Sequence, residues 1–180
     1  MKPEKDIIWT VGHSTRPIEE FLKVLAAGGI ELLADVRRFP GSRRYPQFNQ
    51  EALAASLSDA GIEYRHFVDL GGRRTERLAN SPNTGWRVES FNAYADYMQS
   101  GEFLAALDSL MAAARDKSTA IMCSEALPQK CHRRLIADAL TSRGWEVRHL
   151  LSPKRIDDHQ LTAFARVSGK QLTYPAETLF

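Results

Sequence analysis

The sequence predicts a single α/β domain in which about five strands form a mostly parallel sheet, with helices on both faces in a Rossmann-like three-layer arrangement. Two observations predict it. Short apolar runs alternate with segments whose apolar residues recur at helical spacing, and no repeat, low-complexity tract or linker divides the 180 residues. We therefore expect one domain over residues 1–180, with its motif-bearing core at about 7–152 and a C-terminal helix and tail at 153–180.

Five short runs are rich in apolar residues and are expected to be strands. Their lengths are typical of strands, and turn residues or helical patterns separate them. Because helical segments lie between them, the strands are expected to pair mostly in parallel. In chain order the expected strands are 7–11, 30–36, 62–70, 118–124 and 145–151.

The segments between the strands have apolar residues three or four positions apart, which is typical of helices with one buried face. Stripes of this kind cover 18–25, 103–111 and 135–140, and Asn49 is a suitable N-cap for a further helix. These helices are expected to end at Gly28-Gly29, Gly61 and Gly144. A last helix is expected from near Asp157 toward Val167, and the segment 73–89, with turn residues and little periodicity, is expected to be a functional loop.

The composition excludes several classes of protein. Hydrophobic residues at 43% and charged residues at 26% are typical of a globular chain. No apolar run approaches the roughly 20 residues of a membrane span, and the N-terminus lacks the apolar core of a signal peptide, so we expect a cytoplasmic protein with no membrane partner. Two cysteines are too few for a disulfide scaffold. The net charge of +2 argues against coating nucleic acid through bulk charge, whereas local basic patches and a homo-oligomer both stay open.

Unusual polar residues lie at or near the ends of all five expected strands. In open α/β sheets, ligands bind outside the carboxyl ends of the strands. We therefore expect these residues to form one site. They are Gly12-His13-Ser14, Asp35-Val36-Arg37, Gly71-Gly72-Arg73, Ser124-Glu125 and His149.

Four residues are candidates for catalysis: His13, Glu125, His132 and Cys131. Histidine is the commonest acid/base group near neutral pH, and a carboxylate at the mouth of an apolar strand is either an acid/base group or the partner of an arginine. Cys131 stands at the start of a helix, where the dipole lowers the pKa of a thiol. Cys123 is interpreted as a small buried residue at a strand end. The histidines and Cys131 also have a purely structural interpretation, in packing or hydrogen bonds.

Zinc is the metal that the cysteine and histidine residues would hold. The spacing matches known zinc sites poorly, since neither a C-x-x-C nor an H-x-x-x-H pair is present. An adjacent cysteine and histidine, such as Cys131 and His132, rarely point the same way from a helix. A zinc site formed by Cys123, Cys131, His132 and His13 therefore stays open as an alternative, although no metal ligand is assigned, and the sequence predicts no particular cofactor.

Arginine outnumbers lysine by 17 to 7, and its planar fork suits phosphate or carboxylate. Four arginines fall in the segment 36–48, which contains no acidic residue and several aromatic ones, a mixture used to hold phosphates and stack bases. Asp35 has two interpretations: it orients His13 or binds a hydroxyl, or it pairs with Arg37. The expected ligand-binding residues are Ser14, Asp35, Arg37, Arg43, Arg44, Gly71, Gly72, Arg73 and Arg133.

Several short motifs occur in a fixed order along the chain. They are Val11-Gly12-His13-Ser14, Leu33-Ala34-Asp35-Val36-Arg37 with Pro40 and Ser42, Leu70-Gly71-Gly72, and Met122-Cys123-Ser124-Glu125 followed by Cys131-His132-Arg133. With this combination over about residues 7–152, the chain resembles the uncharacterised bacterial family called domain of unknown function 488. The resemblance implies a compact α/β protein whose motif residues line one site. It implies no particular reaction.

Two classes of function are compatible with these residues. In the first, the protein is an enzyme that acts on a phosphate-bearing substrate, a nucleotide or nucleic acid, with arginines holding phosphate and His13 and Glu125 as acid and base. In the second, it is a binding or sensing module that holds an anionic small molecule or a nucleic-acid strand and performs no chemistry. Loss of turnover with retained binding after a change at His13 would distinguish the enzyme from the module.

Overall fold

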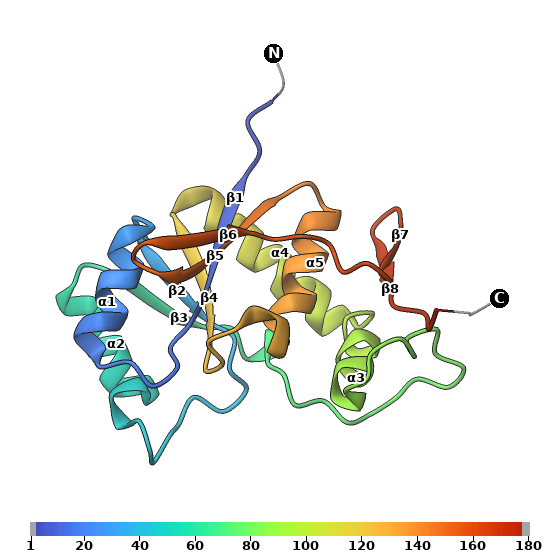
Figure 1. Cartoon of the computed structure of the whole chain (residues 1–180), viewed down its shortest axis with the longest axis horizontal. Coiled ribbons are helices and arrows are strands. Elements are labelled where there is room, and N and C mark those ends of the chain that lie inside the picture. Colours follow the sequence, from blue (N-terminus) through green and yellow to red (C-terminus); the bar gives the residue numbers. More distant parts are fainter. Residues whose placement is uncertain (1–2, 178–180) are drawn as a thin grey trace.

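The computed structural model describes residues 3–177, and its centre is a six-stranded sheet (Figure 1). Five strands are mutually parallel, and the sixth runs antiparallel at one edge. The strands are β1 (Ile7–Gly12), β2 (Leu32–Asp35), β3 (Glu63–His66), β4 (Thr119–Cys123), β5 (Glu146–Ser152) and β6 (Arg155–Asp158), in the order β3-β2-β4-β1-β5-β6. The predicted α/β class and mostly parallel sheet are confirmed, with one strand more than predicted.

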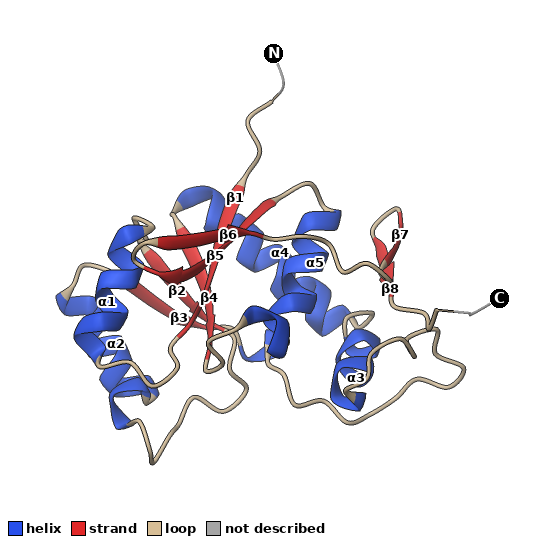
Figure 2. Ribbon diagram, viewed as in Figure 1, coloured by secondary structure: helices blue, strands red, loops and turns tan. Residues whose placement is uncertain are grey.

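Helices cover both faces of this sheet, as Figure 2 shows. Neighbouring strand residues point into two separate cores, because side chains alternate along a strand. Ala34 and Ile121 pack in one core, whereas Leu33 and Met122 pack in the other. The first core contains residues of α3 (Glu89–Tyr97), α4 (Gly101–Asp116) and α5 (Arg133–Ser142), and the second contains residues of α1 (Ile18–Ala27) and α2 (Gln50–Asp59).

The prediction of a helix from near Asp157 toward Val167 is wrong, because strands form there instead. The chain turns back after β5, and β6 pairs with it so that Ile156 lies opposite Leu150. A small antiparallel pair follows, β7 (Arg166–Ser168) and β8 (Gln171–Thr173). Pairing with the open edge of β5 satisfies backbone groups that a separate helix would leave exposed. Apolar residues near this small pair pack on the main domain without forming a helix. Leu172 and Tyr174 are buried in the first core.

Helix α3 follows the predicted loop at 73–89 and was not expected from the apolar pattern. Its buried residues include Asn92 and Asp96, so its inner face has no continuous apolar stripe. The Asn92 side chain accepts from the backbone nitrogen of Trp86 at 3.0 Å and donates to its carbonyl at 3.1 Å. Asp96 accepts from Asn83 Nδ2 at 2.8 Å and from the backbone nitrogen of Leu78 at 2.9 Å. These two polar side chains tie the loop to the helix.

Strand order brings the carboxyl ends of β2, β4 and β1 side by side. Gly12 at the end of β1 lies opposite Cys123 of β4, and Asp35 of β2 lies opposite Met122. The third strand is shorter than predicted, because the chain leaves β3 after His66 and forms the 3-10 turn η2 (Val68–Leu70). Polar residues that follow these strands therefore meet at one edge of the sheet.

Within residues 3–177, none of the helices combines the length and the apolar character needed to cross a membrane.

Candidate active site

A pocket of about 720 Å³ opens at the carboxyl edge of the sheet. Segments that are far apart in the sequence form its walls: the ends of β1, β2 and β4, the arginine-rich loop after β2, the segment after Gly71, and the start of α3. Most of the residues expected to form a site line this pocket. They are His13, Ser14, Arg37, Gly72, Arg73, Glu125, Cys131 and His132.

The other expected site residues lie outside the lining. The expectation that His149 joins the site is wrong, because its side chain is buried and hydrogen-bonded to Thr10 and His159. Asp35 and Arg133 are fully buried behind it, and Gly71 is also buried. Arg43 and Arg44 are exposed on the loop beside the pocket. Arg38, Phe39 and Tyr45 belong to the basic and aromatic segment 36–48 of the sequence, and they also line the pocket. Further lining residues are Arg74, Tyr94 and Lys130. Tyr94 could not have been found from the sequence, because its helix was not predicted.

Gly12 lets the loop after β4 cross closely over the end of β1. A Cβ atom at Gly12 would lie 1.9 Å from the carbonyl oxygen of Glu125. The two loops are joined by backbone hydrogen bonds, from His13 N to Cys123 O and from Ser14 N to Ser124 O, both 2.9 Å long. Ser14 adopts a φ of 51°, which is unusual for a residue other than glycine. This tight junction places His13 and Cys123 in the same pocket.

The imidazole of His13 is held in one orientation. Nδ1 lies 2.9 Å from the carbonyl oxygen of Ser14, which can only accept, so Nδ1 carries the hydrogen. Nε2 then accepts from Arg37 Nη1 at 3.4 Å. The ring stacks on Phe48 with 4.2 Å between centroids. Burial, reinforced by the charge of Arg37, lowers the pKa of His13 from 6.5 to about 4, so the ring is neutral near pH 7.

Asp35 forms a buried ion pair with Arg37. One carboxylate oxygen accepts from Arg37 Nε at 2.9 Å, and the other accepts from Arg37 Nη2 at 2.8 Å. The second oxygen also accepts from the Tyr64 hydroxyl at 2.6 Å. The second interpretation of Asp35, as the partner of Arg37, agrees with this geometry. Arg37 contacts both this carboxylate and His13 Nε2, so its guanidinium links the two side chains.

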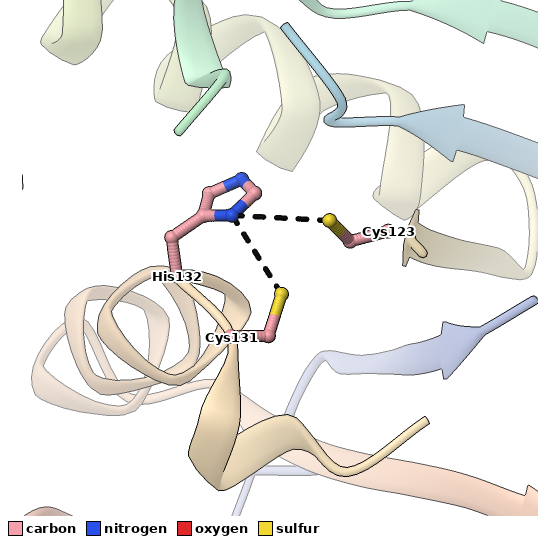
Figure 3. A group of neighbouring side chains, drawn as sticks. All are labelled: Cys123, Cys131 and His132. Atoms are coloured by element: carbon pink, nitrogen blue, oxygen red, sulfur yellow. Dashed lines mark hydrogen bonds between the residues drawn. The ribbon is translucent and has the colours of Figure 1, made fainter. Parts of the chain in front are cut away.

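Cys123, Cys131 and His132 meet on the floor of the pocket (Figure 3). The Nδ1 atom of His132 lies 3.6 Å from Cys131 Sγ and 3.9 Å from Cys123 Sγ. A hydrogen bond from the Cys123 thiol, together with the charge of Arg133, lowers the pKa of Cys131 from 9.0 to about 6. The same hydrogen bond, together with burial, raises the pKa of Cys123. Cys131 is therefore the more acidic thiol, as its position before a helix predicts.

The expectation that Cys131 and His132 point in different directions is wrong. Cys131 precedes α5 and has extended backbone, with φ −133° and ψ 149°, whereas His132 is the N-cap and has φ −58° and ψ −15°. This change of backbone conformation between adjacent residues turns both side chains to the same side. The geometry of a helix does not apply to this pair, because α5 begins only at Arg133.

The rim of the pocket is strongly basic. Arg38, Arg73, Arg74 and Lys130 line it, and among the described residues none of them has a carboxylate within salt-bridge distance. The only acidic lining residue within residues 3–177 is Glu125, whose side chain is exposed. Four unpaired cations around one opening favour an anionic ligand.

Comparison with known families agrees with the resemblance seen in the motifs. The model of the family described as Domain of unknown function DUF488 matches residues 17–140, more than half of the chain. The chain belongs to this family. Neither a search of curated proteins nor a search of solved structures finds a match.

The segment that matches the DUF488 model contains most of the pocket. Asp35, Arg37, Cys123, Cys131 and His132 all lie within residues 17–140. His13 precedes the matched segment but is joined to it through the backbone hydrogen bond to Cys123. The family description names no activity.

Proposed function

We propose that this DUF488 protein is an enzyme that acts on a phosphate-bearing substrate, a nucleotide or a nucleic-acid strand. The observation that carries the proposal is the composition of the pocket, where four unpaired cations and Arg37 stand against the single carboxylate of Glu125. Arginine forks bind phosphate oxygens in pairs, and lysine adds a point charge. A pocket of about 720 Å³ has the size of a small-molecule site.

The arginines at the rim are positioned by backbone contacts. Arg38 Nη1 donates to the carbonyl of Arg73 at 3.1 Å, and Arg74 Nε donates to the carbonyl of Gly71 at 3.1 Å. The Arg74 guanidinium also lies 3.7 Å from the centre of the Tyr97 ring. Arg73 adopts a φ of 57°, a conformation that costs free energy and occurs often at functional sites. These contacts hold the guanidinium groups of Arg38 and Arg74 before any ligand binds, which reduces the entropy lost on binding.

A nucleobase is favoured over a simple phosphate because aromatic rings accompany the cations. The ring of Phe39 lines the pocket and is 63% exposed, and the Arg38 guanidinium lies 5.5 Å from its centre. Tyr45 is a second ring in the lining. Exposed rings beside guanidinium groups are used to stack bases while phosphates are held. A second pocket of about 450 Å³ shares Arg38, Arg74 and Thr75 with the first, so the two cavities adjoin.

His13 is the candidate general base. Its Nε2 lone pair is directed into the site, since Nδ1 donates to Ser14 and the only contact of Nε2 in residues 3–177 is Arg37 Nη1 at 3.4 Å. A substrate hydroxyl or water that replaces this long contact would find an acceptor there. Glu125 at the exposed rim is the candidate for the opposite role, the acid, and Cys131 and His132 complete the floor.

The experiment combines binding and turnover. Nucleoside mono-, di- and triphosphates and short single-stranded oligonucleotides are incubated with the protein, and products are identified by mass spectrometry. Affinity for a fluorescent oligonucleotide is measured at several salt concentrations. The double variant Arg38→Gln/Arg73→Gln should weaken binding and lower the salt slope by about two. Arg43→Gln/Arg44→Gln removes the same charge from exposed positions outside the pocket and is the matched control.

A third variant, His13→Gln, should keep binding and lose turnover by roughly 100-fold or more. Equal losses of affinity in the two double variants would show that bulk charge, and not the pocket, holds the ligand. Tight binding with no turnover of any compound in the panel would instead favour the binding or sensing module.

A further inference from the structure

Three side chains on the floor of the pocket have the donor atoms and the spacing of a metal site (Figure 3). The sulfur atoms of Cys123 and Cys131 and Nδ1 of His132 all lie within 4.8 Å of one another. Zinc binds thiolate sulfur at about 2.3 Å and imidazole nitrogen at about 2.0 to 2.1 Å, so a tetrahedral ion separates a nitrogen ligand from a sulfur ligand by roughly 3.6 Å. The observed separations from Nδ1 are 3.6 Å and 3.9 Å.

His132 already has the orientation and tautomer of a metal ligand. Its Nε2 lies 2.9 Å from the carbonyl oxygen of Val36, so Nε2 carries the hydrogen and the Nδ1 lone pair faces both sulfur atoms. A ligating histidine usually donates its other nitrogen to a carbonyl or carboxylate in this way. The ring also packs edge-on against Tyr94, with 5.2 Å between centroids. Gly72 adjoins it so closely that a Cβ atom there would lie 2.8 Å from Nδ1.

We propose that Cys123, Cys131 and His132 bind one zinc ion, whose fourth coordination position opens into the basic pocket. Binding leaves two thiolates and one neutral imidazole around the ion, and any proton still held by either thiol is released to solvent. A set of two sulfur atoms and one nitrogen atom, without a carboxylate, selects zinc over magnesium or calcium. Three protein ligands with one open position are typical of catalytic zinc sites, whereas structural sites have four.

A disulfide between Cys123 and Cys131 is the competing interpretation, and the position of His132 argues against it. In the disulfide both thiol hydrogens are lost, so the buried Nδ1 would face two sulfur atoms that cannot donate to it. An unpartnered buried acceptor is costly. A metal ion satisfies all three atoms at once.

The consequence for chemistry rests on the proposed function. A zinc ion on the floor would present a bound water, acidified to a pKa of about 7, or would polarise a substrate oxygen, within the same cavity as the arginines and His13. The substrate class would then be a phosphate ester that is hydrolysed by water. The zinc site itself does not depend on the identity of the substrate.

The test measures metal content and coordination independently of activity. The chain is purified under reducing conditions, loaded with Zn²⁺ or Co²⁺, and freed of excess metal. We expect one metal ion per chain by elemental analysis, and for Co²⁺ the near-ultraviolet absorption of cobalt–thiolate bonds together with visible bands of tetrahedral cobalt. Cys123→Ser, Cys131→Ser and His132→Gln should each lose the metal or the tetrahedral bands. His13→Gln, a change in the same pocket outside the ligand set, should keep both.

The outcomes separate this proposal from the proposed function. No stoichiometric metal in the reduced wild-type chain, metal retained in all three ligand variants, or a mass lower by two hydrogen atoms without bound metal would overturn the zinc site. If a ligand variant fails to fold, X-ray absorption of the zinc-loaded wild-type chain decides, because it counts sulfur and nitrogen neighbours directly. Absence of stoichiometric metal in a chain that turns over a phosphate compound would refute the zinc site alone, and bound metal without turnover of any phosphate compound would refute the function alone.

Discussion

The guanidinium of Arg133 and the carboxylate of Asp138, five residues apart on α5, are the two ends of one buried chain of hydrogen bonds. Arg133 Nη1 donates to Thr10 Oγ1 at 3.2 Å, and Thr10 contacts His149 Nδ1 at 2.6 Å. His149 Nε2 contacts His159 Nδ1 at 2.9 Å, and His159 Nε2 donates to Asp138 at 2.7 Å. The chain therefore links the buried guanidinium of Arg133 to the buried carboxylate of Asp138 through Thr10, His149 and His159.

Thr10 is the link in this chain that a single change can remove. Thr10→Val keeps the shape of the side chain but leaves Arg133 Nη1 without an acceptor and His149 Nδ1 without a donor, and Arg133 Nε already lacks a partner among the described residues. We expect a loss of roughly 1–3 kcal/mol in the free energy of unfolding, measured by urea denaturation. Thr10→Ser keeps the hydroxyl and is the control. Equal stabilities of the two variants would mean that the hydrogen-bond chain contributes nothing measurable.

His149 should make the folded protein sensitive to acid. Burial and the charges of His159 and Arg133 lower the pKa of His149, whereas the charges of Asp157 and Asp138 raise it. The net result is a pKa of about 3 in place of 6.5. His149 therefore binds a proton below about pH 6.5 in the unfolded chain, but only below about pH 3 in the folded chain. The free energy of unfolding falls as the pH falls from 6.5 to 3. Between pH 7 and pH 5 this one residue should remove up to ~2 kcal/mol of unfolding free energy.

The measurement compares wild type with His149→Gln at both pH values. Glutamine does not titrate in this range, so the variant should lose less stability between pH 7 and pH 5 than the wild type does. An identical pH dependence in the two proteins would contradict the lowered pKa of His149.

The buried ion pair of Asp35 and Arg37 gives a third prediction. Asp35→Asn removes the negative charge that compensates the buried guanidinium of Arg37. The new amide nitrogen cannot accept the hydrogen bonds that Arg37 and Tyr64 donate to the carboxylate. Loss of one member of a buried pair costs roughly 3–5 kcal/mol. The exposed pair of Glu63 and Lys117, with 2.6 Å between charged atoms, provides the control, since Glu63→Gln should change unfolding little. Similar unfolding curves for the two variants would show that Arg37 does not depend on Asp35.

The general position of this site, although not its chemistry, could be predicted from the sequence. Apolar periodicity is a local property, so it predicted the five parallel strands, and the rule on strand ends then brought His13, Arg37 and Cys131 to one edge. Periodicity failed where tertiary contacts decide the structure. The strand β6 exists because β5 has an open edge, and α3 is held by the polar side chains of Asn92 and Asp96.

The orientation of single side chains was beyond the sequence. Arg38 and Arg43 belong to one basic segment, yet only Arg38 lines the pocket. Cys131 and His132 point the same way because the chain changes from extended to helical backbone between them. This change of backbone conformation depends on how η3 (Pro128–Lys130) and α5 pack on the sheet. The spacing of residues along the sequence does not predict that packing.

Gly72 provides the last prediction, because it is a spacer for His132. A Cβ atom at position 72 would lie 2.8 Å from His132 Nδ1 and 2.9 Å from its Cγ. The ring cannot retreat freely, since Nε2 is bound to the Val36 carbonyl and the other side packs on Tyr94. Gly72→Ala should therefore lower the unfolding free energy by roughly 1–3 kcal/mol through overpacking. Gly41→Ala is the matched control, because Gly41 lines the same pocket and a Cβ there would meet nothing within 4 Å. Equal stability of the two variants in chemical denaturation would show that His132 has room to move.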